Sequence, residues 1–325
     1  MRLLKLVPDN TNIKFLKWAL PFYVVSAILV VASFAMVFTK GLNLGVDFVG
    51  GQQIQVTFTE SEQAPVAELR EQVSALGFGE PVIQQFGAEN EVSIRFRLPE
   101  EVASDPAASS EMTTRVTTQI TENFADARID DLSSVSGKVS GELFTTAMYA
   151  LAIAMIMIAI YIWVRFEWQF GVGALLALVH DVSLTLGMFA LFQLEFDLKI
   201  IAAILTIIGY SLNDTIVIYD RIRENLKKYR KMPIVELLDL SVNETLARTV
   251  MTSLTLLVVL VALLLLGPQS LFGFTAAITL GIFVGTYSSV YMAAPILIWL
   301  GVTSDSFVPQ ETVADRQEKK ARGEI

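Results

Sequence analysis

The chain has no cysteine and a single histidine among its 325 residues. The lack of cysteine excludes disulfides, thiol chemistry and a cysteine-ligated zinc site. Charged residues are also scarce, at 18%, whereas soluble proteins have about 25%. The long polar segment contains neither histidine nor a Ser, His and Asp set. The sequence therefore predicts no enzyme activity, no metal site and no cofactor.

Long hydrophobic runs dominate what remains, and 53% of the residues are hydrophobic. About 20 apolar residues in a helix cross a hydrocarbon core roughly 30 Å thick, and lipid cannot satisfy an open backbone. The predicted membrane helices cover residues 18–38, 143–164, 169–190, 198–219, 249–266 and 271–300. The first run could instead be a signal peptide cleaved near Ser33-Phe34-Ala35, but its length and the five later spans favour an uncleaved anchor. Gly281, Gly285 and Pro295 predict a tilt or break in the last span.

The basic residues set the predicted orientation. Short segments on one side carry 15 Lys and Arg, against eight on the other side. The positive-inside rule then places four segments in the cytoplasm: the N-terminus (1–17), the turn 165–168, a loop (220–247) and the tail (301–325). Residues 39–142 form a domain outside the cytoplasm, and residues 143–300 form the bundle of the last five spans. The outer segment holds 17 Asp and Glu against seven Lys and Arg, which suits neither nucleic acid nor an anionic lipid surface.

The outer segment reads as alternating strands and helices. The predicted order is strand 53–59, helix 65–76, strand 81–86, strand 91–98, helix 109–127 and strand 128–135. This βαββαβ order is that of the ferredoxin-like fold. With no catalytic constellation in it, the domain reads as a binding or moving module.

Two glycine-rich segments connect this domain to the first and second spans, at 41–51 and 135–143. The junction residues singled out are Gly45, Asp47, Gly50, Gly51, Gly137 and Gly141. Glycine permits unusual backbone angles and close packing. Both segments are predicted to be hinges or tight junctions, with ordinary loops as the alternative.

Ionisable residues inside the spans are the main functional candidates, because each costs roughly 2.5–3.5 kcal/mol at the centre of a membrane helix. His180 and Asp181 lie near the midplane of the third span, and Asp214 follows Asn213 in the fourth. Ser241-Val242-Asn243-Glu244 resembles a capping box and predicts the start of the fifth helix, which places Arg248 at the depth of Asp214. The two residues form either a static buried ion pair or a proton site whose charge depends on that pair.

Four sequence blocks carry a specific pattern: 45–51 (Gly-Val-Asp-Phe-Val-Gly-Gly), His180-Asp181, 211–225 (from Ser-Leu-Asn-Asp to Arg-Glu-Asn) and 243–249 (Asn-Glu-Thr-Leu-Ala-Arg-Thr). Together these blocks resemble the SecF family. One departure concerns the junction before the second span, where the family usually has Gly-Pro and this chain has Ser136-Gly137.

The resemblance implies a six-helix, RND-like half with a periplasmic domain, in the bacterial inner membrane. It implies an accessory subunit that couples the proton motive force to protein translocation, with SecD and the SecYEG translocon as partners. YajC, YidC, exported preprotein and membrane lipids are further candidate partners. It maps the proton-pathway carboxylate to Asp214 and the essential arginine to Arg248, with His180, Asp181 and Asn213 as weaker candidates. A half-size RND exporter of lipids or small molecules is the alternative, and a purely structural assembly subunit is a third interpretation.

Overall fold

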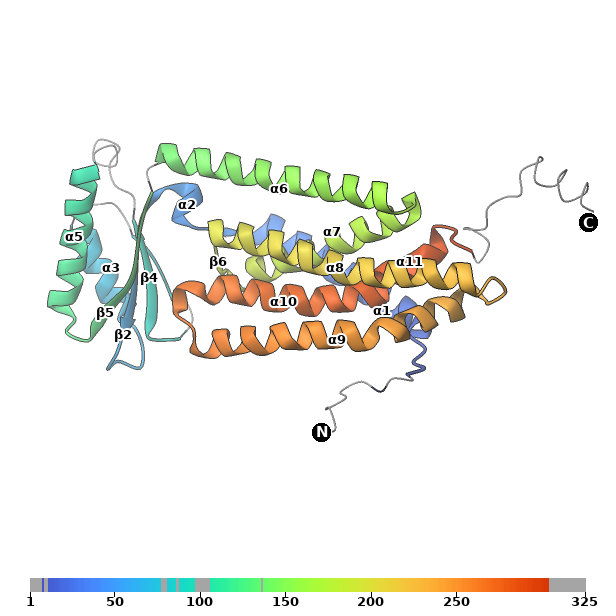
Figure 1. Ribbon diagram of the computed structural model, residues 1–325. Coiled ribbons are helices and arrows are strands. Elements are labelled where there is room, and N and C mark those ends of the chain that lie inside the picture. The colour runs from blue at the N-terminus through green and yellow to red at the C-terminus, as the bar shows by residue number, and fades with distance from the viewer. Residues whose placement is uncertain are drawn as a thin grey trace, which may run out of the picture.

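The computed structural model describes residues 8, 11–76, 81–85, 88–96, 106–135 and 137–303. A small domain built on a sheet lies at one end of a bundle of long helices (Figure 1). Most of the predicted cytoplasmic tail and the end of the predicted strand 91–98 lie outside the described residues.

Six helices in the described part of the chain are long and apolar enough to cross a membrane, which confirms the predicted number. Five are continuous: α1 (Ala19–Lys40), α6 (Gly137–Arg165), α7 (Trp168–Phe192), α8 (Leu198–Lys228) and α9 (Ile234–Leu266). The short helix η1 (Leu16–Trp18) precedes α1, and η2 (Gln269–Leu271) precedes α10. The sixth span consists of α10 (Phe272–Ser288), the wide π turn η3 (Ser289–Ala293) and α11 (Ala294–Trp299). The predicted break thus lies immediately before Pro295.

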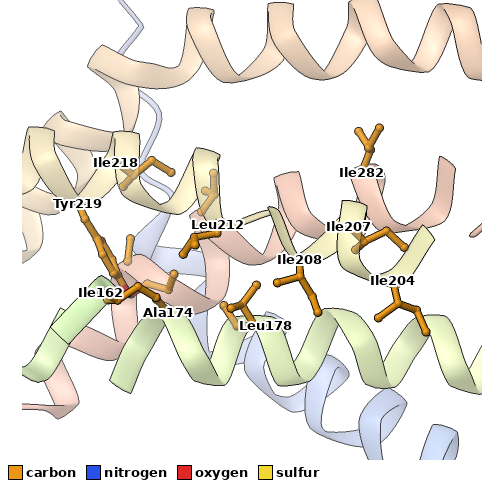
Figure 2. Packing of buried hydrophobic residues seen from close by; sticks show 14 of the residues in the cluster. Ile162, Ala174, Leu178, Ile204, Ile207, Ile208, Leu212, Ile218, Tyr219 and Ile282 are labelled. Atoms are coloured by element: carbon orange, nitrogen blue, oxygen red, sulfur yellow. The ribbon is translucent and has the colours of Figure 1, made fainter. Parts of the chain in front are cut away.

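Three spans form the centre of the bundle. In α7, α8 and the sixth span, at least half of the most apolar 18-residue stretch is buried inside the protein. In α1, α6 and α9 the buried share of this stretch is 17% or less. Ile204 and Ile208 of α8 point toward α7 near Leu178 (Figure 2). Between membrane helices, small residues allow the close approach that van der Waals packing requires. A Cβ on Gly281 of α10 would lie within 2.3 Å of Ile207.

The outer domain is a four-stranded antiparallel sheet with two helices on one face. Its elements are β2 (Gly51–Phe58), α3 (Val66–Ala75), β3 (Val82–Gln85), β4 (Glu91–Phe96), α5 (Pro106–Asn123) and β5 (Ala127–Val135), and the strand order is β3-β4-β2-β5. Ile54, Val56 and Phe58 alternate along β2 and are fully buried in one core with residues of α3 and α5, as the period of a strand requires. The other face of the sheet is turned toward the membrane helices (Figure 1).

The segment 220–247, predicted as a cytoplasmic loop, consists of the ends of two long helices joined by a short connection before Pro233. α8 continues to Lys228 and α9 already begins at Ile234, with Pro233 as its N-cap. The Ser241 hydroxyl donates to the carbonyl of Leu237 one turn earlier and caps no helix end. Leu237 and Leu238 are buried in the core of the bundle, and this packing extends α9 beyond the predicted capping box.

At the second predicted junction, 135–143, β5 ends at Val135 and α6 begins at Gly137 and includes Gly141. Both glycines are therefore part of a helix. A Cβ added at Gly141 would meet nothing within 4 Å. Helix propensity alone disfavours glycine, but a spanning helix must satisfy its own backbone, and the helix continues through both positions.

Candidate functional site

A buried polar cluster surrounds Asp181 of α7, which is fully buried among apolar helices. The Nδ1 of His180 lies 2.9 Å from the Oδ1 of Asp181. Its Oδ2 accepts hydrogen bonds from the hydroxyls of Ser211 on α8 and Ser288 on α10, the latter at 2.9 Å. Both oxygens therefore have partners, and this one carboxylate connects three central helices.

Close helix packing brings these hydroxyls to Asp181. A Cβ on Gly285 of α10 would lie 3.0 Å from the Cβ of Ser211, so α10 approaches α8 at the level of the cluster. Ser288 is the last residue of α10 before the π turn η3, a geometry that often marks functional sites. The sequence analysis did not identify Ser288. A serine inside an apolar span, which can form a hydrogen bond to another helix, could have indicated it.

Asp214 has a different environment on the same helix α8, one turn after Ser211. It is 2% exposed, and its buried Oδ2 has no hydrogen-bond partner among the described residues. On α9, the buried hydroxyl of Thr249 likewise lacks a partner within the described part of the chain. A buried polar atom without a partner is costly and calls for an explanation, such as a functional role.

The predicted pair of Asp214 and Arg248 is not formed. No ion pair joins them among the described residues, and Arg248 is exposed on the face of α9 that points away from the bundle. Asn213 is exposed as well. The physical reason lies in helix phase: Thr249 and Ser253 occupy the inward face of α9, and Arg248 is about 100° away from Thr249 around a helix with 3.6 residues per turn.

A second hydroxyl connection crosses the bundle beside these residues. Ser253 of α9 accepts from the Tyr210 hydroxyl of α8 at 2.9 Å and lies 2.7 Å from the Thr286 hydroxyl of α10. Ser253 thus connects α9 to both α8 and α10, whereas Thr245 of α9 donates to the carbonyl of Ser241 within its own helix.

The first predicted junction, 41–51, forms a compact structure on the outer side. Its strand β1 (Asn43–Leu44) pairs in parallel with β6 (Glu195–Phe196), in the turn between α7 and α8. The short helix α2 (Val46–Val49) follows, N-capped by Gly45, and Asp47 accepts from the backbone N–H of Leu198 at 3.0 Å. A Cβ on Gly45 would lie 2.9 Å from Glu195 Oε1, so a larger residue here would displace the end of that side chain.

Backbone geometry explains the two glycines that end this junction. Gly50 and Gly51 have φ of 72° and 123°, angles that favour glycine. They turn the chain from α2 into β2. Phe48 of α2 packs edge-on against Phe144 of α6 at 5.5 Å between ring centroids and contacts Phe196 at 6.0 Å. Segment 41–51 is therefore a compact connection between α1 and β2.

Two carboxylates near this junction have a raised pKa. Burial raises the pKa of Glu195, against the opposing effects of a hydrogen bond from Gln53 and the charge of Arg95. Burial also raises the pKa of Asp197, against the charge of Lys199. Both groups lie between the α7 and α8 spans. Each is therefore easier to protonate than an exposed carboxylate.

Comparison with known proteins identifies the family. Residues 115–303 match the family model "Protein export membrane protein SecD/SecF, C-terminal", and residues 35–62 match "SecD/SecF GG Motif". "Protein translocase subunit SecF" of Rhodobacter capsulatus is 44% identical over 92% of this chain and 92% of its own length. The protein of that name from Vibrio alginolyticus is 38% identical over 97% of this chain and 98% of its own. The chain belongs to the SecF family. The resemblance noted from the four sequence blocks is thereby confirmed.

A solved structure extends this SecF assignment to three dimensions. The crystal structure of SecDF, "a translocon-associated membrane protein" from Thermus thermophilus, superposes with a TM-score of 0.80 at 36% identity, over 90% of this chain. The match spans only 39% of that SecDF chain. The matched segment 35–62 contains β1, α2 and β2, so the matched motif includes the outer junction.

Proposed function

We propose that this SecF-family chain is an accessory subunit of the Sec translocon that couples the proton motive force to the movement of exported polypeptide. The observation that carries the proton part of the proposal is the buried, unpartnered carboxylate oxygen of Asp214 in the centre of α8. The translocation part rests on relatives named protein translocase subunit SecF.

Asp214 suits a transient proton site better than Asp181 does. Both oxygens of Asp181 already have partners, so a change in its protonation would break existing bonds. Asp214 has a free oxygen and no cation beside it in the described structure, and such a group exchanges a proton without dismantling a network. His180, whose Nε2 also lacks a partner in the described residues, and Asn213 are secondary pathway candidates. Arg248 would join the site only when α9 rotates or a partner subunit covers it.

The available driving force is of the right size. One charge crossing the membrane gains about 2.3 kcal/mol per 100 mV, and each pH unit adds about 1.4 kcal/mol. Together these suffice to shift a two-state orientation whose forms differ by a few kcal/mol. The load would be the outer domain, which we assign to the ferredoxin-like fold and to the periplasmic side, with both termini in the cytoplasm.

The partner supported best is SecD, because the matched crystal structures are of SecDF. The SecYEG translocon, exported preprotein, YajC, YidC and membrane lipids complete the proposed set of partners in the bacterial inner membrane. The SecF family name is what favours the Sec machinery over other membrane assemblies.

The test is proton-driven export in inverted membrane vesicles that contain the assembled complex. Asp214→Asn and Arg248→Met should abolish the dependence of export on the proton gradient while membrane levels of the protein stay normal. Asp220→Asn is the matched control, since it removes a half-exposed carboxylate from the same helix, where it pairs with Arg165 and such pairs contribute little. Unchanged gradient dependence in both Asp214 and Arg248 variants would contradict the proton proposal.

One feature favours the exporter alternative. An apolar cavity of about 360 Å³ lies among α1, α6, α7 and α8, lined by Phe48, Phe144, Leu186, Phe196 and other apolar residues. The exporter interpretation expects a small hydrophobic substrate to copurify with the protein and expects no association with the translocon. A pull-down from solubilised membranes that recovers SecD and SecY without such a substrate decides for the translocon subunit.

A further inference from the structure

The outer domain is attached to the membrane helices at a third place that is not a chain connection. Besides the covalent links to α1 and α6, the sheet contacts the turn between α7 and α8, where Gln53 of β2 donates to Glu195 of β6. β6 lies on the side of the sheet that faces the membrane helices (Figure 1). Sequence analysis predicted only the two covalent junctions. This third contact is made by side chains from strands that are distant in sequence.

Arg95 of β4 is the centre of one half of this contact. Its guanidinium donates to the carbonyl of Leu44 at 2.7 Å, to the Asn43 side chain at 2.7 Å and to the Gln84 side chain at 2.8 Å. Asn43 in turn donates to Gln84 and to the carbonyl of Gln193, both at 2.9 Å. Arginine offers five donors in a rigid fork, and this one ties β3 and β4 of the sheet to β1, the strand that pairs with β6.

Gln53 of β2 makes the other half. It is 5% exposed, on the sheet face turned toward the membrane, and its amide donates to the Glu195 carboxylate at 2.6 Å. Gln53 and Arg95 are directly paired across β2 and β4, so one position of the sheet supplies both contacts. A hydrogen bond to a carboxylate is stronger than one between neutral groups.

The contact continues directly into α8. Asp197 caps the helix by accepting from the N–H of Ile200, and Asp47 accepts from the N–H of Leu198. From Leu198 the helix runs without interruption to Lys228 and includes Asp214. At 1.5 Å per residue, Asp214 is about 24 Å from this first turn. A displacement of α8 along its axis therefore reaches β6, Glu195 and the sheet through a short series of bonds.

The remaining sheet face is not held in the same way. A polar cavity of about 180 Å³ lies next to this contact, lined by Glu195 and Asn43 and also by Gln55, Ser93 and Ser270. Gln55 Oε1 and Ser93 Oγ are buried there without a hydrogen-bond partner in the described structure. Polar attachment is thus concentrated at the β1–β6 side.

We propose that Gln53, Arg95 and Glu195 are positioning residues that clamp the outer domain to the first turn of α8, so that this clamp, besides the chain junctions, transmits movement of α8 to the domain. This inference rests on the proposed function, because it assumes that α8 moves when Asp214 changes its protonation. The clamp remains closed through the cycle, and opening it uncouples the domain from the helix.

The test uses a charge exchange in the full chain within the assembled complex. Gln53→Glu places a carboxylate against Glu195 and should open the clamp. The double variant Gln53→Glu with Glu195→Gln restores a carboxylate–amide pair in the opposite direction and should close it again. Arg95→Gln should act like Gln53→Glu. Arg128→Gln is the matched control, because Arg128 is on the same sheet with a largely exposed side chain that pairs with Asp130.

Two measurements are needed. Hydrogen exchange of peptides covering 41–51 and 193–198 reports the clamp itself and should rise about tenfold or more in Gln53→Glu, as expected when a hydrogen bond to a charged group is lost. Gradient-dependent export reports coupling, and should fall at least several-fold in Gln53→Glu and Arg95→Gln, recover in the double variant and stay normal in Arg128→Gln.

The outcomes separate the clamp from the proposed function. Gln53→Glu with an open clamp and normal gradient dependence overturns the clamp proposal, as does unchanged exchange in that variant. A wild-type protein without gradient dependence overturns the proposed function. The clamp is then judged by hydrogen exchange alone. Asp214→Asn as a single variant must alter exchange in the outer domain, and it must fail to do so when it is combined with Gln53→Glu.

Discussion

The hydroxyl of Ser288 offers a direct test of the Asp181 cluster. Ser288→Ala removes one of two donors to Asp181 Oδ2, and Ser211→Ala removes the other. Hydrogen bonds between membrane helices contribute about 0.6 kcal/mol on average and up to about 1.7 kcal/mol. We expect each single variant to lower the free energy of unfolding by about 1 kcal/mol, because the second hydroxyl still satisfies the oxygen.

The double variant should cost more than the sum of the two. It leaves a fully buried carboxylate oxygen without a partner, which costs roughly 1–3 kcal/mol more. The assay is reversible unfolding in mixed detergent micelles, analysed as a double-mutant cycle. Ser289→Ala is the matched control, since this neighbouring hydroxyl donates to the carbonyl of Thr286 in its own helix and should contribute little. Additivity within about 0.5 kcal/mol would refute the view that Asp181 unites α7, α8 and α10.

Three further predictions concern packing and the outer junction. In Gly187→Val, the new side chain collides with α1, since even a Cβ would lie 2.8 Å from the Cα of Ser33. We expect a loss of about 1–3 kcal/mol in the free energy of unfolding. Gly209→Ala is the control and should be neutral or stabilising, because a Cβ at Gly209 would meet nothing within 4 Å. Burial raises the pKa of Glu195 from its ordinary value of 4.5, so the closed junction binds more protons than the open one above that pH, and its stability falls as pH rises through this window. Glu195→Gln should flatten this slope in hydrogen exchange of 193–198 measured between about pH 4 and pH 8, and an unchanged slope would assign the titration to Asp197 or another group. Asp47→Ala removes the acceptor for the Leu198 N–H and should cost about 0.5–2 kcal/mol as other capping losses do, seen as faster exchange at the start of α8, while Asp47→Asn should retain most of the protection.

Local patterns predicted the elements of this protein well and their ends less well. Six apolar runs are sufficient to find six membrane helices, because each must be both long and apolar. The alternation of apolar residues in 53–59 and 91–98 likewise identified β2 and β4. Ser241 and Glu244 misled, since the same residues that form a capping box at a helix start also occur inside a helix. What decided there was the burial of Leu237 and Leu238, a tertiary fact that a local pattern does not contain.

The charged residues show where sequence reasoning about a membrane site must stop. Depth along the helix axis follows from residue count, and on that measure Asp214 and Arg248 should meet. Direction around the axis depends on which face each helix presents to its neighbours, and here Asp214 is turned inward and Arg248 outward. The same count could not find Ser288, more than a hundred residues after Asp181, as the partner of that carboxylate. An exposed arginine in a membrane helix is costly. The outward position of Arg248 therefore points to a surface that is covered in the assembled complex. The matched SecDF chain is longer than the part that this protein matches, and its remaining part is what would cover this surface. Pairing of Arg248 would then depend on assembly, and Asp214 would retain its free oxygen within this chain.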